Sequence, residues 1–204
     1  MGFLSASAAF TRFRFTEPVP KELWGNISAK LKQYSFKDID DIPEERGWGW
    51  VNFDDMLDAS WTTSPPEKGE YICFSLRLDT RRIPPAVLKK HTLIAIREEE
   101  KKAKEQGRDY ISRTRKKEIQ DAVKGKLMTR FLPIPAEFNV VWNTRDNIVY
   151  FASTQEKVIH LFTEFFSLTF DLDLEPLTPF SLAAHLLGEE SIKKLEDVTL
   201  TRFV

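Results

Sequence analysis

Apolar and polar residues alternate along several short segments of the chain, and this pattern predicts β-strands with one apolar face. In residues 71–78, for example, Ile72, Phe74 and Leu76 alternate with less apolar neighbours. Segments with at least a partial alternation are 9–16, 71–78, 138–142, 148–151 and 171–177. A polar stretch, 143–147, separates two of them and predicts a β-hairpin. The segment Gly47–Val51 fits a packed turn or a strand.

Apolar residues three or four positions apart predict helices elsewhere. One helix is expected to open at Pro20, with Leu23, Ile27, Leu31 and Tyr34 on one face. Further helices are expected to begin at three sites, which are Pro84-Pro85, Ser153 or Thr154, and Ser181. Strands and helices in this mixed order predict an α+β fold, with antiparallel or mixed sheets packed against helices.

The apolar pattern is lost from Arg97 to Glu118, where the apolar residues are Ala103, Tyr110 and Ile111. Lys, Arg, Asp and Glu make up most of the remaining positions. A helix without an apolar face has little to bury locally, so it acts as a spacer or contacts another molecule. This stretch therefore predicts helices whose distant ends stand clear of the core.

Turn and capping signals divide the charged stretch into two helices. Gly107 is expected to break the first helix, and Asp109 or Ser112 to cap the second. The apolar positions of the second helix, Ile119 and Leu127, indicate that its far end is packed. The expected organisation is a single α+β unit over 1–190, a projecting antiparallel helical hairpin over 84–130 and a charged tail over 191–204.

Charge is unevenly distributed along the chain. Residues 81–130 contain 16 Lys or Arg and 7 Asp or Glu, whereas the whole chain contains 30 and 31. The remainder therefore holds 14 basic and 24 acidic residues. A localised basic stretch suits a protein that binds a phosphate backbone. The alternative is a solvated hairpin whose charges pair along the helix, as Glu98 with Lys102 and Glu100 with Lys104 would.

Aromatic side chains are scarce in the basic stretch, where Tyr110 and His91 are the candidates for base stacking. Proteins that bind single strands combine basic grooves with exposed aromatic rings. The scarcity predicts contacts with the phosphate backbone, and so binding without sequence preference.

Acidic clusters supply the candidate catalytic chemistry. Asp171, Asp173 and Glu175 fall on one face of an expected strand, where they would hold a divalent metal as in a nuclease or form its solvated face. The acidic loop 38–45 presents the same two alternatives. We favour the solvated interpretation of both, and therefore expect a protein that is not an enzyme and has no catalytic residues, cofactor or metal.

Other sequence features limit the class of protein. Nucleotide-binding glycine loops, the G-x-S-x-G motif and zinc-type Cys/His spacing are absent from the sequence. Cys73 is the single cysteine and lies in an apolar strand, which suits a core residue in a reducing cytoplasm. No apolar run has the length of a membrane span. The sequence thus predicts a cytoplasmic protein.

The order and spacing of several segments resemble the recombination-associated protein RdgC family of bacteria. The segments that carry the resemblance are Gly49-Trp50-Val51, R-x-I-P-P-x-V-L at 81–88, L-x-x-R-F-L-P at 127–133, V-V-W-N-T-x-D-N-I-V at 140–149, Ala152-Ser153 and Pro176-Leu177. The similarity extends from about Phe10 to about Leu187. The C-terminal region of the family has no counterpart beyond about residue 190.

The resemblance implies a nucleoid-associated DNA-binding protein that binds duplex and single-stranded DNA and restrains the RecA recombinase by competing for DNA. It also implies a homodimer, for which Tyr110 and Ile111 near the hairpin tip are the expected weak contact. The cations chosen as phosphate contacts are Arg81, Arg82, Lys89, Lys90, Lys116, Lys117, Lys124 and Lys126. The alternative functions are a protein-interaction module with the hairpin as its docking arm, and a metal-dependent nuclease.

Overall fold

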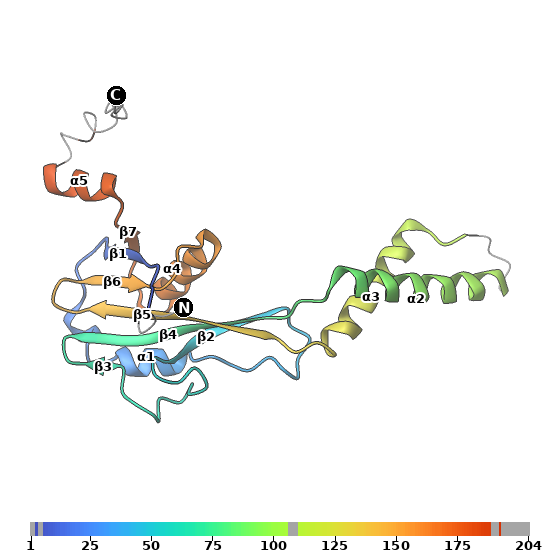
Figure 1. Ribbon diagram of the computed structural model, residues 1–204, viewed down its shortest axis with the longest axis horizontal. Coiled ribbons are helices and arrows are strands. Elements are labelled where there is room, and N and C mark those ends of the chain that lie inside the picture. Colours follow the sequence, from blue (N-terminus) through green and yellow to red (C-terminus); the bar gives the residue numbers. More distant parts are fainter. Residues whose placement is uncertain (1–2, 4–5, 106–109, 189–191, 193–204) are drawn as a thin grey trace. The chain divides into compact units, whose positions relative to one another are not determined.

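The computed structural model describes Phe3, residues 6–105, residues 110–188 and Ile192, and the described part has an α+β fold (Figure 1). The chain divides into two compact units. Unit 1 comprises Met1–Ser35, Trp50–Leu76 and Glu137–Val204, and unit 2 comprises Phe36–Gly49 and Arg77–Ala136. The expected hairpin over 84–130 falls within unit 2. Its projection from the rest of the protein stays a prediction, and the expected tail lies outside the described residues except for Ile192.

A seven-stranded antiparallel sheet is the main β-structure, with the strand order β2-β4-β5-β6-β1-β7 and with β3 paired to β4. The strands are β1 (Thr11–Phe15), β2 (Arg46–Asn52), β3 (Glu67–Lys68), β4 (Tyr71–Thr80), β5 (Ile134–Asn143), β6 (Ile148–Phe151) and β7 (Leu174–Pro176). The register of β5 on β6 pairs Trp142 with Val149, which confirms the hairpin expected around the polar turn.

Aromatic side chains dominate the core of unit 1. The rings of Phe151 on β6 and Phe162 on helix α4 (Glu156–Phe170) stack with their centroids 4.0 Å apart. Trp50 is fully buried, and its indole Nε1 donates to the hydroxyl of Thr169 at 2.8 Å. A buried indole N–H needs such a partner, because an unpaired polar group in the core is costly. Cys73 is also buried, and burial raises the pKa of its thiol.

The helix expected from Pro20 is interrupted. A 3-10 turn, Lys21–Leu23, is followed by α1 (Ile27–Gln33), with Trp24, Gly25 and Asn26 between them. The side-chain amide of Asn26 donates to the backbone carbonyl of Glu22 at 3.0 Å, so a side chain takes the place of a helical hydrogen bond. Leu23, Ile27 and Leu31 are nevertheless all buried, as the apolar spacing predicts.

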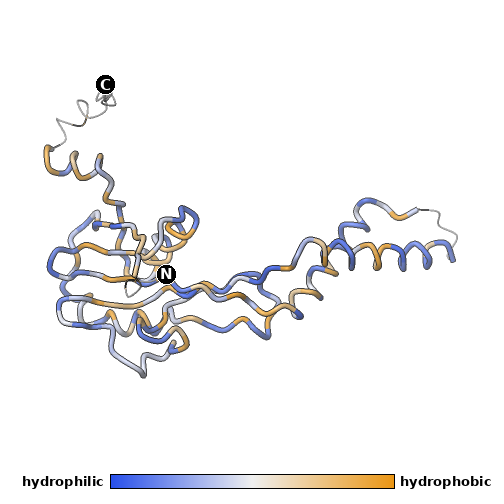
Figure 2. The backbone as a smooth tube through the Cα atoms, viewed as in Figure 1, coloured by the Kyte–Doolittle hydropathy of each residue, from blue (hydrophilic) through white to orange (hydrophobic). Residues whose placement is uncertain are grey.

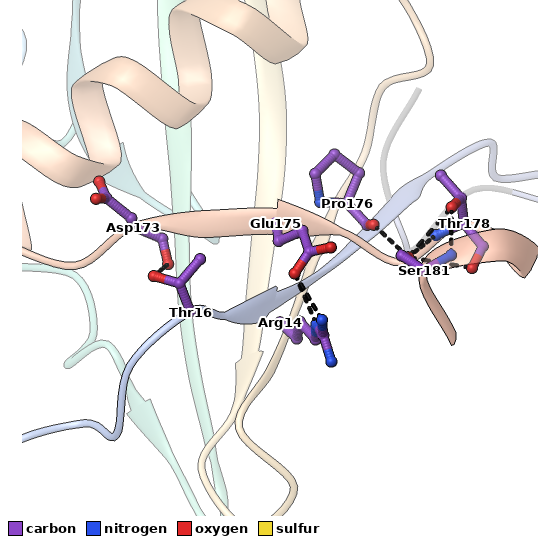
Figure 3. Close-up of polar contacts among 7 residues, drawn as sticks. All are labelled: Arg14, Thr16, Asp173, Glu175, Pro176, Thr178 and Ser181. Carbon is purple, nitrogen blue, oxygen red and sulfur yellow. Dashed lines mark hydrogen bonds and ion pairs between the residues drawn. The ribbon is translucent and has the colours of Figure 1, made fainter. Parts of the chain in front are cut away.

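The acidic strand expected at 171–177 is shorter than predicted. Asp171 ends α4 in a left-handed conformation with φ 59°, and β7 begins only at Leu174. Glu175 pairs with Arg14 of β1 at 2.7 Å (Figure 3). Thr178 and Ser181 cap each other's backbone at the start of α5 (Pro179–Leu187). The three acids of the nuclease hypothesis therefore do not share a strand face.

Unit 2 contains the helical hairpin. Helix α2 spans Pro85–Glu105 and α3 spans Arg113–Met128, and the two helices pack against each other. The hydroxyl of Ser112 accepts a hydrogen bond from the backbone N–H of Arg115 at 3.2 Å, which confirms Ser112 as the cap. Gly107 and Asp109 lie outside the described residues. None of the helices in the described ranges is long and apolar enough to cross a membrane.

Candidate nucleic-acid interface

The two helices of the hairpin bury few of their own side chains. Helix α2 has no buried residue, and α3 buries Ile119, Leu127 and Met128. Hydrophilic positions recur along both helices (Figure 2). Arg115 joins the helices through an ion pair with Glu99 of α2 at 2.8 Å. Because so much of the hairpin is polar and exposed, its surface is available to another molecule.

A cavity of about 710 Å³ lies between α2 and α3. Its lining residues are Thr92, Ile96, Arg113, Thr114, Lys116, Lys117 and Gln120. Three of them are cations and none is a carboxylate. The hydroxyl oxygen of Thr92 is buried without a hydrogen-bond partner among the described residues. The cavity therefore presents positive charge, which suits a phosphate oxygen, whereas the Thr92 hydroxyl is closed to solvent.

The charges at the start of α3 oppose the helix dipole. The first five residues of the helix include Arg113, Arg115, Lys116 and Lys117, and its first turn holds no acid. The N-terminal end of a helix carries partial positive charge, so cations there destabilise the helix and anions stabilise it. A bound polyanion would relieve this repulsion.

Most of the cations predicted to contact phosphate lie on the surface of unit 2. These exposed residues are Arg82, Lys89, Lys90, Lys116, Lys117, Lys124 and Lys126. Only Lys124 among them forms an ion pair within the described part of the chain. The pairs Glu98–Lys102 and Glu100–Lys104 are not formed between these described side chains, whereas Arg115 pairs along α3 with Glu118 at 3.0 Å, as the solvated alternative expects.

Lys124 is engaged by the acidic loop. Its ammonium lies 2.8 Å from the carboxylate of Glu45, and both side chains are about half exposed. The hydrogen bond and the charge of Lys124 lower the pKa of Glu45. A phosphate would therefore compete with Glu45 for this lysine.

Arg81 is a correction to the sequence prediction. The residue is 2% exposed, so it cannot neutralise an external phosphate. Its guanidinium donates to the backbone carbonyls of Ile39, Asp40, Ile42 and Glu44. Several backbone carbonyls in one loop attract a planar cation with several donors, and this contact buries Arg81. The acidic loop is thus organised around an internal arginine.

Tyr110 and Ile111 precede the cap of α3. Tyr110 is 82% exposed, and Ile111 is partly buried. Because Tyr110 is so exposed, most of its ring is available to a partner. The dimer contact at these residues stays a prediction.

Arg113 and Thr92 are cavity residues that the sequence pattern did not single out. The signal for Arg113 was present, because Arg113, Lys116, Lys117 and Gln120 recur at i, i+3, i+4 and i+7 and so share one face of a helix. Nothing in the sequence indicated Thr92, because the sequence does not show which residues of α2 lie beside this face of α3.

The acidic residues do not form a metal site within the described ranges, where no group of three or more His, Cys, Asp or Glu is placed to hold an ion. Glu175 pairs with Arg14, and the Asp173 carboxylate accepts from the Ser167 hydroxyl at 2.7 Å. Comparison of the chain with protein-family models gives no matching family. Comparison with curated proteins gives no matching relative.

Proposed function

We propose that the protein binds DNA without sequence preference, through the cations of its α2–α3 hairpin. The observation that carries this proposal is the cavity between the helices, which is lined by Arg113, Lys116 and Lys117 and by no carboxylate. Cations without acidic partners favour a polyanion, because each phosphate contact releases bound counterions from DNA. The binding is non-enzymatic, and duplex and single-stranded DNA are both ligands.

Two further observations support the proposal. The basic residues are concentrated in residues 81–130 although the whole chain has a formal net charge of −1. The segments that resemble the RdgC family add an expected role, which is to restrain a recombinase by competing with it for DNA. This role and a nucleoid location belong to the proposal.

The experiment that tests DNA binding compares two triple variants of equal charge change. One carries Arg113→Gln, Lys116→Gln and Lys117→Gln. The other carries Lys32→Gln, Arg145→Gln and Lys157→Gln, which are exposed cations of unit 1. Duplex affinity is measured by fluorescence anisotropy at several salt concentrations, with and without magnesium.

We expect the hairpin variant to bind more weakly on every duplex sequence, and the unit 1 variant to bind nearly as well as the parent. Removal of one phosphate-binding cation should make the slope of log affinity against log salt shallower by about 0.9. Equal losses of affinity in the two variants would mean that the change in net charge alone weakens DNA binding. An unchanged hairpin variant, or a parent that binds no DNA at low salt, would exclude the proposed function.

The second candidate function is a protein-interaction module with the hairpin as its docking arm. Leu93 and Ile94 on α2 favour it, because they are 46% and 43% exposed. Exposed apolar residues next to one another suit a protein partner better than DNA. The same salt titration separates the candidates, since an apolar contact depends only weakly on salt.

A further inference from the structure

Unit 2 contains a second cleft, which the proposed function does not use. Its volume is about 280 Å³, and its lining residues are Lys37, Asp38, Ile39, Ile42, Glu44, Arg46, Gly47 and Trp48. Trp48 lies on β2 and is 43% exposed, whereas Trp50 two positions along the strand is fully buried. A tryptophan that is nearly half exposed accepts a flat ligand on its indole ring with little loss of existing side-chain packing.

The wall of this cleft is fixed by buried contacts. The guanidinium of Arg81 binds four carbonyls of the loop 39–44, which forms one side of the cleft. Ile39 is 2% exposed and packs directly on Gly47, where an added Cβ would lie 2.6 Å from the Ile39 Cγ2. Buried contacts therefore fix the backbone of the cleft and its base at Ile39 and Gly47, while the other lining side chains are exposed.

The charges around the cleft identify the kind of contact it makes. Lys37 and Arg46 are balanced by Asp38 and Glu44, so the lining has no formal net charge. A site that recognised phosphate alone would carry an excess of cations, as the α2–α3 cavity does. The lining instead combines the exposed ring of Trp48 with two cations and two carboxylates, and this matches a flat aromatic ring whose flanking phosphates meet Lys37 and Arg46.

We propose that this cleft binds an unpaired nucleobase of single-stranded DNA, which stacks on Trp48 while Lys37 and Arg46 contact its flanking phosphates. The inference rests on the proposed function for the class of ligand, since the α2–α3 cations lie in the same compact unit. A base inside a duplex is already stacked on its neighbours, so the cleft distinguishes single strands from duplex.

The test measures the affinity of the folded protein for a labelled single-stranded oligonucleotide and for the matching duplex. The variants are Trp48→Ala, the conservative Trp48→Phe, and Tyr71→Ala as a control. Tyr71 is 38% exposed and belongs to unit 1, so its removal deletes an exposed aromatic ring outside the cleft. Far-UV circular dichroism and the thermal midpoint verify that each variant folds.

We expect Trp48→Ala to weaken single-strand binding by about 5-fold to 150-fold, the range that removal of one base–aromatic stack gives. Duplex affinity and the salt slope should remain those of the parent. Trp48→Phe should retain most of the affinity, and Tyr71→Ala all of it. The parent's tryptophan fluorescence should also fall on addition of single strands, and this fall should be smaller in Trp48→Phe.

The results separate this inference from the proposed function. Unchanged single-strand binding by Trp48→Ala would overturn the stacking site, even if the hairpin variant had lost all DNA binding. Equal losses on single strands and duplex would also overturn it, because they place Trp48 in a general interface. Single-strand binding that depends on Trp48 but not on Arg113, Lys116 and Lys117 would support the cleft and exclude the hairpin.

Discussion

The guanidinium Nη2 of Arg81 donates to the backbone carbonyl of Ile39 at 2.8 Å, across 42 positions of sequence. Ile39 in turn packs on Gly47 of β2, next to the exposed Trp48. Arg81 lies within the most basic part of the chain, yet it binds the carbonyls of an acidic loop and not an external ligand. The charge of Arg81 therefore stabilises this loop, and the exposed cations of the hairpin are the ones available to bind a polyanion.

Replacement of Arg81 by Ala should reduce the free energy of unfolding by about 3 kcal/mol, because four buried or partly buried carbonyls lose their donor. Urea denaturation monitored by circular dichroism measures the change. Arg82→Ala is the matched control, since Arg82 is exposed and its removal should change stability by less than about 0.5 kcal/mol. A stable Arg81→Ala variant with weakened DNA binding would restore Arg81 as a phosphate contact.

Asp58 should make stability depend on pH in the acid range. Burial raises the pKa of its carboxyl, but hydrogen bonds from the backbone N–H groups of Thr63, Ser60 and Thr62 outweigh burial and lower the pKa from 3.8 to about 2. A lowered pKa in the folded state means that the ionised group stabilises the fold. This stabilisation is present above pH 3.8 and is lost as the pH falls to about 2.

Asp58→Asn should therefore be less stable than the parent at neutral pH and should lose less stability between pH 3.8 and about 2. Thermal midpoints measured across this range test the expectation. Asp55→Asn is the control, because the carboxylate of Asp55 in the same loop accepts one backbone hydrogen bond, from Leu57 at 2.9 Å. Parallel pH profiles for the parent and Asp58→Asn would contradict this role.

Glu45→Gln should strengthen duplex binding at low salt. Glu45 pairs with Lys124 at 2.8 Å, so its neutralisation frees one cation of α3 for phosphate. The slope of log affinity against log salt should steepen by about 0.9, which corresponds to one additional phosphate neutralised. Glu17→Gln, which removes an exposed acid of unit 1, provides the control. An equal gain in both variants would mean that net charge alone is responsible.

Tyr110→Lys with Ile111→Glu should convert a weak homodimer into a monomer without unfolding the protein. Tyr110 is 82% exposed, and a symmetric contact would bury it in both subunits. Sedimentation velocity over a range of concentrations measures the association. A dimer that persists in the double variant would place the contact elsewhere, and a parent that stays monomeric at high concentration would refute the expected dimer.

The sequence by itself determined most of the local structure. Period-two alternation located β4 and the β5–β6 hairpin, and apolar spacing identified Leu23, Ile27 and Leu31 as buried even though the helix is interrupted. These patterns succeed because a residue's burial follows from its position on one face of an element. The interruption itself was missed, since it depends on the hydrogen bond from Asn26 to Glu22.

Only the tertiary structure decided which cations are available to a ligand. Arg81 and Arg82 are neighbours of identical type, yet the first is buried by carbonyls of a distant loop and the second is exposed. Likewise, the sequence contains Thr92 and Trp48 but does not place one in a cavity beside α3 or the other in an open cleft. Local periodicity states which face of an element is apolar, whereas long-range packing decides what lies against it.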